Sequence, residues 1–361
     1  MKHFWKEILE YGPRSVGTPA HDRVTDYIFN EMKKLSGHAY LDGFIFEGWL
    51  NHSPSFLRVT EPVERKLESF LFLGSGAGEF KGYMKKIGKN YVWNMYGWDL
   101  YAVVSEDEKI IAWISGRNEG GLLSQTLIEG NSDLPHLIIG EEENKWLNHL
   151  LLTEHAVKAE GKADCSAVPE MKGNNIVAPF RNGAPDQKDI ILCAHYDSMY
   201  NTVGAYDNGA GAAVLMSLAR RFSKNPPKKN LVLVFTDGEE CRLEGSKHFA
   251  EGVRPEQTEY VLNIDGIGRG QELEIWCGRE PFARKIYELL AKYEEIPEKI
   301  IKWPPPPGSD HQPFYAKGIH TCMYTFNDQG ILHTERDVYQ ESMLRNMEKM
   351  EKLVLYTLEY G

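Results

Sequence analysis

Residues 190–197 read IILCAHYD, an unbroken apolar run that ends in a histidine and an acid. Two more runs of this kind follow at residues 231–240 (LVLVFTDGEE) and 260–265 (YVLNID). Short apolar runs without alternating polar residues are typical of strands that are buried on both faces of a sheet. We therefore predict an α/β fold with a mixed central sheet flanked by helices.

The residues that end these runs carry the chemistry. In an open α/β sheet, ligands bind outside the carboxyl ends of the strands, so polar residues placed there are expected to meet at one edge. They are one histidine and several acids: His195, Glu239, Glu240, Asp265 and, in the loop after the first run, Asp207. An imidazole and ionised carboxylates form a ligand set for Zn²⁺ or a similar divalent cation.

A second imidazole is available near the C-terminus, where residues 331–334 read ILHT and include His333. Two imidazoles and three carboxylates are too many for one tetrahedral zinc ion. They suit two ions ~3.5–4 Å apart with one bridging carboxylate. Because such dense negative charge would repel itself without cations, the residues predict a metal centre rather than a bare pair of acids.

These motifs, taken together, resemble peptidase family M28, the zinc aminopeptidases with two catalytic metal ions. The resemblance includes residues 195–197 (HYD), 207–209 (DNG), 237–240 (DGEE), 263–265 (NID) and 333–334 (HT). Residues 12–19 (GPRSVGTP) and 308–314 (GSDHQPF) look like further signatures of the family. Five ligand positions in the expected order are a more specific signal than any single motif.

The resemblance implies a role for each site residue. It implies two Zn²⁺ ions. One ion would be held by His195 and Asp265, the other by Glu240 and His333, and Asp207 would bridge them. Glu239 is implied to be the general base that takes a proton from a metal-bridging water and hands it to the leaving amine. Asp197 is implied to orient the ring of His195 through the free N–H.

One position departs from the family pattern. Some members carry a tyrosine just before the last histidine ligand, where it polarises the scissile carbonyl, but here Leu332 occupies that position. Stabilisation of the oxyanion is then left to the metal ions or to a tyrosine from elsewhere. Tyr324 is a candidate because it lies nearby in the sequence.

Composition narrows the class of protein. The chain has 361 residues, 42% of them hydrophobic, and a formal net charge of -11. That charge argues against nucleic acid or an anionic membrane as a partner, and no apolar run reaches the length of a membrane span. The N-terminus lacks the apolar core of a signal peptide, so a cytoplasmic location is expected. Five scattered cysteines without a CxxC pair argue against a disulfide framework.

The segment between the first predicted helices and the central strands has the sequence pattern of short β-strands. Short strand-like runs appear from about residue 43, separated by Gly, Asn and Asp. We predict a metallopeptidase domain of residues 1–42 and 168–361, interrupted by a small β-rich insert of residues 43–167. The insert resembles the protease-associated (PA-type) domains that several M28 members carry. Restricting access to the active site and mere packing are equally open roles for it.

Several further residues receive weaker assignments. Arg14 is expected at the surface or as a helix cap, with the rim of the active site as the alternative. Most of the 12 histidines, including His21, are expected at the surface or in packing. His311 is expected beside the metal ligands rather than among them. Trp303, before the run of four prolines, is predicted to form part of a substrate pocket wall, with a rigid connector as the alternative.

The predicted function is a di-zinc aminopeptidase that releases N-terminal residues from peptides. A carboxypeptidase or another small-amide hydrolase on the same fold stays open. A receptor-like protein without catalysis, or a one-zinc glutaminyl cyclase, is disfavoured because every ligand position is filled. Oligomeric state, residue preference and the native metal are not determined by the sequence.

Overall fold

The computed structural model describes residues 1–93, 96–181, 187–296 and 298–361. These form two compact units. Unit 1 contains residues 1–46, 172–332 and 336–361, and unit 2 contains residues 47–171 and 333–335. The predicted division after residues 42 and 167 remains a prediction.

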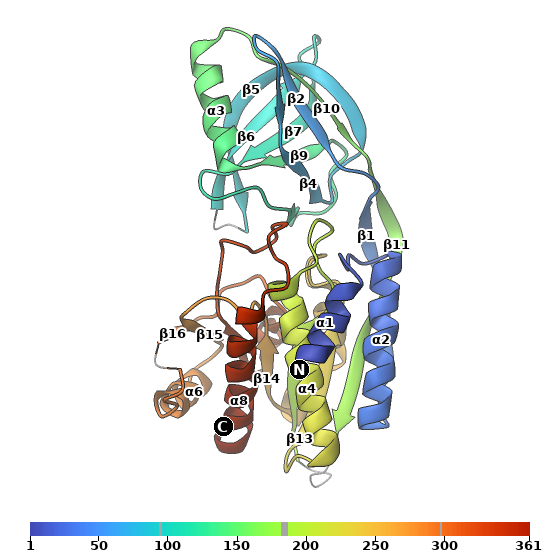
Figure 1. Cartoon of the computed structure of the whole chain (residues 1–361), viewed down its shortest axis with the longest axis vertical. Coiled ribbons are helices and arrows are strands. Elements are labelled where there is room, and N and C mark those ends of the chain that lie inside the picture. Colours follow the sequence, from blue (N-terminus) through green and yellow to red (C-terminus); the bar gives the residue numbers. More distant parts are fainter. Residues whose placement is uncertain (94–95, 182–186, 297) are drawn as a thin grey trace. The chain divides into compact units, whose positions relative to one another are not determined.

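Unit 1 is built on a mixed sheet of eight strands (Figure 1). In spatial order the strands are β1 (Tyr40–Asn51), β11 (Cys165–Phe180), β13 (Asn230–Thr236), β12 (Asp189–His195), β14 (Thr258–Ile264), β17 (Thr321–Thr325), β15 (Leu273–Cys277) and β16 (Lys299–Lys302). The central strands β13, β12, β14 and β17 are parallel to one another. Their carboxyl ends therefore lie at one edge, which is the arrangement predicted from the apolar runs.

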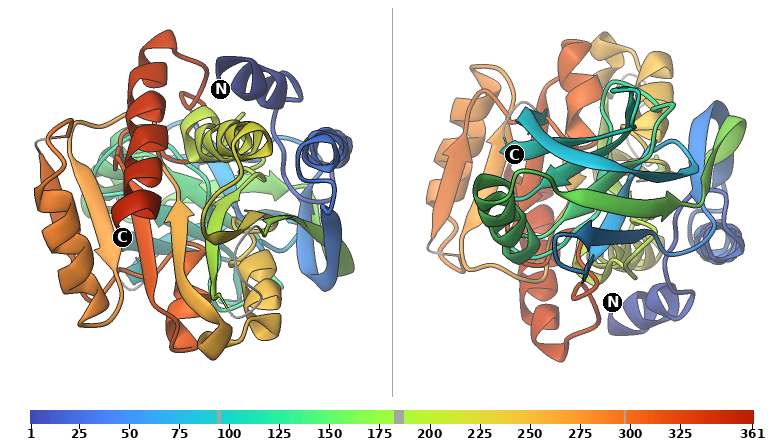
Figure 2. Two further views of the ribbon diagram at one scale, coloured as in Figure 1. Left: turned by 90° about the horizontal axis from the view of Figure 1, so that it is seen from below. Right: turned by 90° about the horizontal axis from the view of Figure 1, so that it is seen from above.

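Helices cover both faces of this sheet, as Figure 2 shows. The helices of unit 1 are α1 (Lys2–Glu10), α2 (Pro19–Ser36), α4 (Ala210–Lys224), α5 (Glu244–Gly252), α6 (Phe282–Ala291), α7 (His311–Ala316) and α8 (Leu344–Tyr360). Short helical segments are η1 (Ala205–Gly209), η2 (Pro255–Gln257) and η3 (Glu341–Met343).

The alternation of β12 explains its unbroken apolar sequence. Ile190 and Leu192 pack in the cluster that contains side chains of α1, α2, α4, α6 and α8. Ile191 and Cys193 point to the other face and pack with side chains of α5 and α7. Since both faces are covered, neither tolerates polar residues, and each fully buried large side chain contributes roughly 1.5–3 kcal/mol.

Helix α2 is capped at both ends by residues that favour those positions. Thr18 is the N-cap, and its side chain accepts a hydrogen bond from the backbone N–H of His21 at 3.2 Å. Pro19 occupies the first turn, where its missing N–H costs nothing. The helix ends at Gly37, whose φ of 71° is in the left-handed region that favours glycine. These caps fix the first turn of α2, which carries His21.

The described residues of unit 2 form a mixed sheet of nine strands and one long helix, α3 (Glu141–Thr153). In spatial order the strands are β3 (Arg65–Leu67), β2 (Phe56–Glu61), β10 (Lys158–Ala163), β5 (Gly78–Val92), β6 (Tyr96–Val104), β7 (Ile110–Gly116), β9 (His136–Ile139), β4 (Ser69–Leu73) and β8 (Gln125–Thr126). The β-rich character predicted for this segment is confirmed.

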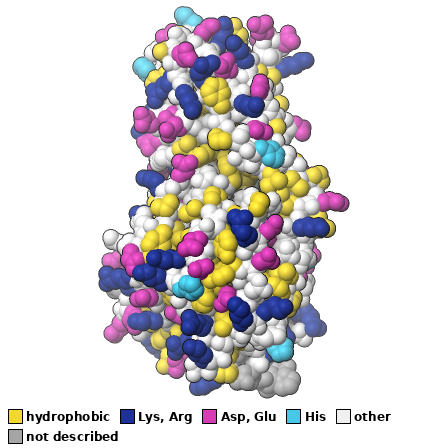
Figure 3. All heavy atoms as spheres, turned by 45° about the vertical axis from the view of Figure 1, so that its right-hand side comes forward, with side chains coloured by type: hydrophobic (Ala, Val, Ile, Leu, Met, Phe, Trp, Pro, Cys, Tyr) yellow, Lys and Arg dark blue, Asp and Glu magenta, His cyan; other side chains and the backbone are white. Residues whose placement is uncertain are grey.

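The charged side chains and the cysteines are distributed as follows. On the face shown in Figure 3, acidic and basic side chains are interspersed rather than separated. All five cysteines lie in the described part of the chain, and each is a buried thiol without a disulfide.

Candidate metal centre

The predicted site residues follow neighbouring parallel strands. His195 is the last residue of β12, Asp265 directly follows β14, and Glu239 and Glu240 follow β13 after a short turn. Asp207 lies in η1, in a non-helical conformation with φ of -120° and ψ of 97°. The structure thus brings these five residues to the carboxyl edge of the sheet, as predicted.

His195, Asp207 and Asp265 form a group that could hold a metal ion, since one ligand atom of each lies within 4.8 Å of the others. The Nε2 atom of His195 lies 3.0 Å from Oδ1 of Asp207 and 3.3 Å from Oδ1 of Asp265. Glu239 Oε2 is 4.0 Å from the same nitrogen. All four residues have side chains that are at least nine-tenths buried.

The donor set of this group fits a divalent cation. Neither ring nitrogen of His195 has a hydrogen-bond partner among the described residues, although both are buried. Burial lowers the pKa of His195, but the charges of Glu239 and Asp265 outweigh that effect and raise the pKa well above its usual value. The cluster therefore demands positive charge among its carboxylates, and a cation bound by deprotonated ligands would supply it.

A second candidate group shares Asp207 with the first. Within unit 1, the ligand atoms of Asp207 and Glu240 lie within 4.8 Å of each other. The backbone of His333 has a φ of 58°. The short segment His333–Glu335 is grouped with unit 2, and the backbone N–H of Ser124 donates to the carbonyl oxygen of His333 at 3.1 Å.

Asp197 lies beside His195 and also binds the turn that follows β13. Its Oδ1 atom lies 3.4 Å from Nδ1 of His195, which is long for a hydrogen bond. Its two carboxylate oxygens accept the backbone N–H groups of Glu239 and Glu240, each at 3.2 Å. Asp197 is fully buried, so it anchors the turn that carries the predicted base and one predicted ligand.

Two consecutive hydrogen bonds, from Asn263 to Ser309 and from Ser309 to Asp265, hold the carboxylate of Asp265. The hydroxyl of Ser309 donates to Asp265 Oδ2 at 2.5 Å, and the side-chain amide of Asn263 donates to that hydroxyl at 2.7 Å. Residues 308–314 were recognised as a signature, but sequence reasoning assigned no role to Ser309. Its neighbour Asp310 is also buried and accepts a hydrogen bond from Thr236, and burial raises the pKa of Asp310 to about 6.

Arg14 corrects a prediction. It is fully buried rather than at the surface, in a helix cap or at a rim. Its guanidinium donates to the backbone carbonyls of Tyr196 at 2.7 Å, Val203, and Gly204 at 3.2 Å. Burial lowers its pKa to about 10, which leaves it charged at neutral pH. A buried arginine is rare, but here three carbonyls replace the water lost by its fork of N–H groups.

Asp337 accepts hydrogen bonds from N–H groups of the loop whose carbonyls Arg14 binds. The sequence analysis did not identify it. Its carboxylate oxygens accept the backbone N–H groups of Tyr206 at 2.6 Å and Asp207 at 3.0 Å. It is fully buried, and burial raises its pKa to about 7. The only available signal was an acid four residues after His333, which by itself reads as a surface residue.

Three weaker assignments can now be judged. Tyr324 is not available to an oxyanion, because its hydroxyl hydrogen-bonds to Thr357 at 2.9 Å inside the core. His311 belongs to neither candidate metal group and bonds through Nε2 to the carbonyl of Pro306 at 2.9 Å. Trp303 is 55% exposed, and its role in a pocket wall remains a prediction.

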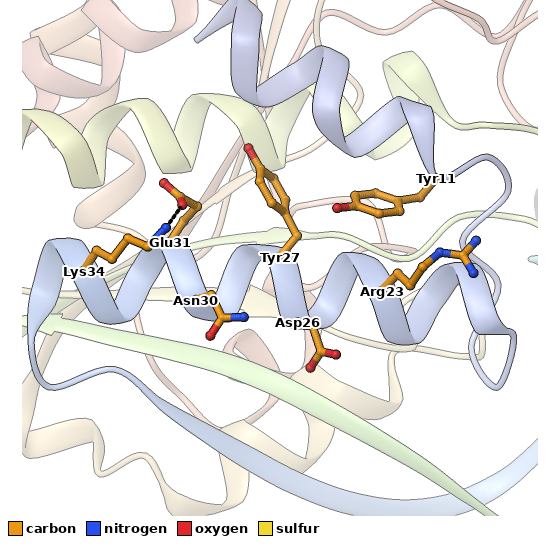
Figure 4. Close-up of a pocket in the computed structure, with 7 residues that line it drawn as sticks. All are labelled: Tyr11, Arg23, Asp26, Tyr27, Asn30, Glu31 and Lys34. Atoms are coloured by element: carbon orange, nitrogen blue, oxygen red, sulfur yellow. Dashed lines mark hydrogen bonds and ion pairs between the residues drawn. The ribbon is translucent and has the colours of Figure 1, made fainter.

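A surface pocket of about 330 Å³ lies along α2 (Figure 4). It is lined by Tyr11, Arg23, Asp26, Tyr27, Asn30, Glu31 and Lys34. None of the predicted site residues lines it, and Glu31 and Lys34 form an ion pair on the helix surface. We therefore assign the chemistry of the protein to the edge of the sheet and not to this pocket.

An α/β sheet that gathers a histidine and several carboxylates at its carboxyl edge defines a protein with the fold and ligand set of a metal-dependent hydrolase. The sequence model of peptidase family M28 matches residues 175–358, just over half of the chain. The chain belongs to peptidase family M28.

Solved structures show the same fold. An aminopeptidase from Aneurinibacillus sp. strain AM-1 has a TM-score of 0.73 and 20% sequence identity, with 99% of this chain and 93% of that chain covered. A zinc aminopeptidase from Bacillus subtilis has a TM-score of 0.74 and 19% identity, with 99% and 94% covered. At these identities the similarity establishes the mixed α/β fold.

Curated relatives contradict one prediction. The vacuolar membrane protease of Lachancea thermotolerans is 25% identical over 219 residues, which is 61% of this chain but 20% of that protein. The chain thus spans about a fifth of the length of this relative. Other relatives carry the same name, so the predicted cytoplasmic location is wrong. The lack of an apolar leader was poor evidence, because an N-terminal leader is only one of the signals that set a protein's location. No helix within the described residues is long and apolar enough to cross a bilayer.

Proposed function

We propose that this chain is a di-zinc aminopeptidase that hydrolyses the N-terminal residues of peptides. One observation within unit 1 carries the proposal: the ligand atom of Asp207 lies within 4.8 Å of those of His195 and Asp265 and also of that of Glu240. A carboxylate shared by two ligand sets is what a bridged pair of ions requires. Membership of family M28 and the aminopeptidase neighbours support the same reaction class.

The chain's residues would divide the two ions between them. His195 and Asp265 would hold one ion, Glu240 and His333 the other, and Asp207 would bridge. When bound, the ions would polarise the scissile carbonyl and lower the pKa of water towards ~7. The buried Ser309 hydroxyl would keep one oxygen of Asp265 oriented and leave the other for the cation.

Glu239 would move the proton. Burial raises its pKa well above the usual value for a carboxyl group, which suits a group that accepts a proton from the attacking water and passes it to the leaving amine. The two backbone N–H groups held by Asp197 fix the turn from which Glu239 extends. Glu239 would therefore reach the reacting atoms from a rigid backbone.

The decisive experiment compares free and N-acetylated peptides with the zinc-loaded protein. An aminopeptidase releases the first residue of the free peptide and leaves the acetylated peptide intact. Equal cleavage of both would reject the aminopeptidase, and release of the C-terminal residue would favour the alternative carboxypeptidase.

Two variants test the assigned roles. Glu239→Gln should retain metal and lose about 10²–10⁴-fold in turnover, whereas undiminished turnover removes Glu239 as the base. Asp207→Ala should reduce the content of both metal ions together. Retention of two equivalents by elemental analysis would show that Asp207 is not the bridge.

We also propose that unit 2 is the PA-type insert. Its mixed nine-stranded sheet with a single long helix supports a β-rich accessory domain. Separate expression of residues 47–171 tests whether this unit has a core of its own, and a cooperative unfolding transition is the expected result.

A further inference from the structure

The turn that carries Glu239 and Glu240 depends on the carboxylate of Asp237. Backbone hydrogen bonds close the turn onto α5, with Gly245 N–H donating to the carbonyl of Asp237 at 2.9 Å. The side chain of Asp237 is fully buried and accepts three hydrogen bonds. Two are from backbone N–H groups, Gly238 at 2.9 Å and Asn174 at 2.8 Å.

The third donor to Asp237 is His21, which sequence reasoning placed at the surface or in packing. His21 Nε2 lies 2.7 Å from Asp237 Oδ1, so this nitrogen carries the proton. The side chains are 3% and 0% exposed. A histidine–carboxylate hydrogen bond in such a dry environment is stronger than one at a surface.

The ring of His21 is itself held in place. It stacks on Tyr196, with ring centroids 5.4 Å apart and planes inclined by 15°. The hydroxyl of Tyr196 bonds to Thr25 Oγ1 and to the carbonyl of Asn174, each at 2.9 Å. Since Thr25 is one turn further along α2, the helix fixes His21 and its stacking partner together.

We infer that His21 is a positioning residue for the turn that carries Glu239 and Glu240, acting through Asp237. This inference rests on the proposed function, because it assigns His21 to the placement of a base and a metal ligand. Asp197 anchors the turn at the N–H groups of Glu239 and Glu240, and the His21–Asp237 pair anchors its first residue. Removal of His21 would leave Asp237 buried with one donor fewer and would weaken the hold on the first residue of the turn.

Three variants separate positioning from packing. His21→Phe keeps an aromatic ring against Tyr196 and removes the hydrogen bond to Asp237. His21→Gln keeps an N–H donor near the position of Nε2. Thr357→Val is the matched control, because it removes a buried hydroxyl hydrogen bond of another helix, α8, with little change in shape and does not touch the His21–Asp237 pair.

Turnover and zinc binding are the two readouts. His21→Phe should lower kcat about tenfold or more with KM within about twofold of wild type, and weaken one of two zinc equivalents by roughly 10–100-fold in calorimetric titration. His21→Gln should recover most of both losses, and Thr357→Val should leave both at wild-type values. The inference is overturned if His21→Phe behaves as wild type, if Thr357→Val causes the same losses, or if His21→Gln is no better than His21→Phe.

A spectroscopic measurement makes the inference separable from the proposed function. In metal-free protein labelled with ¹⁵N-histidine, the His21 Nε2–H should give a downfield, slowly exchanging proton signal that is absent from His21→Gln. If wild type does not cleave peptides, the proposed function fails, while this signal and the zinc titration still decide whether His21 holds the turn. Absence of the signal from wild type would overturn the inference whatever the activity.

Discussion

Asp337 offers the sharpest test of how Asp207, the proposed bridging ligand, is held in place. Its side chain accepts the N–H groups of Tyr206 and Asp207 at 2.6 and 3.0 Å, and it is fully buried. Hydrogen bonds to a charged group are worth roughly 1.5–3 kcal/mol each. Asp337→Ala should therefore lower the free energy of unfolding by roughly 3–6 kcal/mol, a large share of the 5–15 kcal/mol that is typical of a protein.

A milder variant keeps the protein folded for measurement. Asp337→Asn retains one carbonyl-type acceptor and turns an amide group towards the other backbone N–H, so about half the loss, roughly 1.5–3 kcal/mol, is expected. The backbone carbonyl of residue 337, which accepts from Thr202 Oγ1 at 3.1 Å, is unchanged in both variants. Asp328→Asn is the matched control, because that aspartate is partly exposed and its ion pair with Arg269 is worth about 0–1 kcal/mol.

Urea unfolding at pH 8, above the pKa of about 7 for Asp337, measures the loss of stability. Calorimetric zinc titration of the folded Asp337→Asn protein measures whether Asp207 has moved, and both zinc equivalents should weaken. If Asp337→Asn and Asp328→Asn have equal stability and equal zinc affinity, Asp337 does not hold the loop and the reasoning is wrong.

Two other predictions concern buried charges. Arg14→Met removes one donor from each of three buried backbone carbonyls and should cost about 3 kcal/mol or more in urea unfolding. Arg14→Lys should recover only part of this loss because lysine lacks the planar fork, and a loss below about 1 kcal/mol for Arg14→Met would contradict the assignment. In unit 2, burial lowers the pKa of His136 to about 3, so below pH 6.5 the unfolded chain binds a proton that the folded unit does not, and stability falls as the pH falls from 6.5 towards 3. At pH 5 this lowers the free energy of unfolding by about 2 kcal/mol. His136→Gln can still bond to Ser115 and should remove that part of the difference in stability between pH 7.5 and pH 5. An unchanged difference would show that another group titrates.

The placement of the proposed ligands at one edge of the sheet was predictable because it is a property of the strands. His195 and Asp265 each end a parallel strand, and parallel strands bring their carboxyl ends together whatever lies between them in the sequence. The same rule put Glu239 and Glu240 at this edge. For these residues the pattern of apolar runs contains the spatial information.

Arg14, His21 and Asp337 were not predictable in this way. A charged residue in a helical segment or loop is normally at the surface, and nothing in the local sequence shows that its partner is a backbone group far along the chain. Arg14 finds its acceptors 182 to 190 residues away, and Asp337 finds its donors 130 and 131 residues away. Tertiary packing buries these residues, and no periodic pattern in the sequence indicates that they are buried.

The position of Asp207 shows why these distant partners are needed. Its loop leaves β12, turns through η1 and enters α4, so the backbone around Asp207 has no strand or helix partner for all of its polar groups. Arg14 satisfies carbonyls on one part of this loop and Asp337 satisfies N–H groups on the next. A ligand on an irregular loop keeps its geometry only if the surrounding structure holds the backbone. Arg14 in the N-terminal segment and Asp337 in the C-terminal segment of unit 1 therefore support the proposed metal centre as much as the strands do, because removal of either would release the loop that carries Asp207.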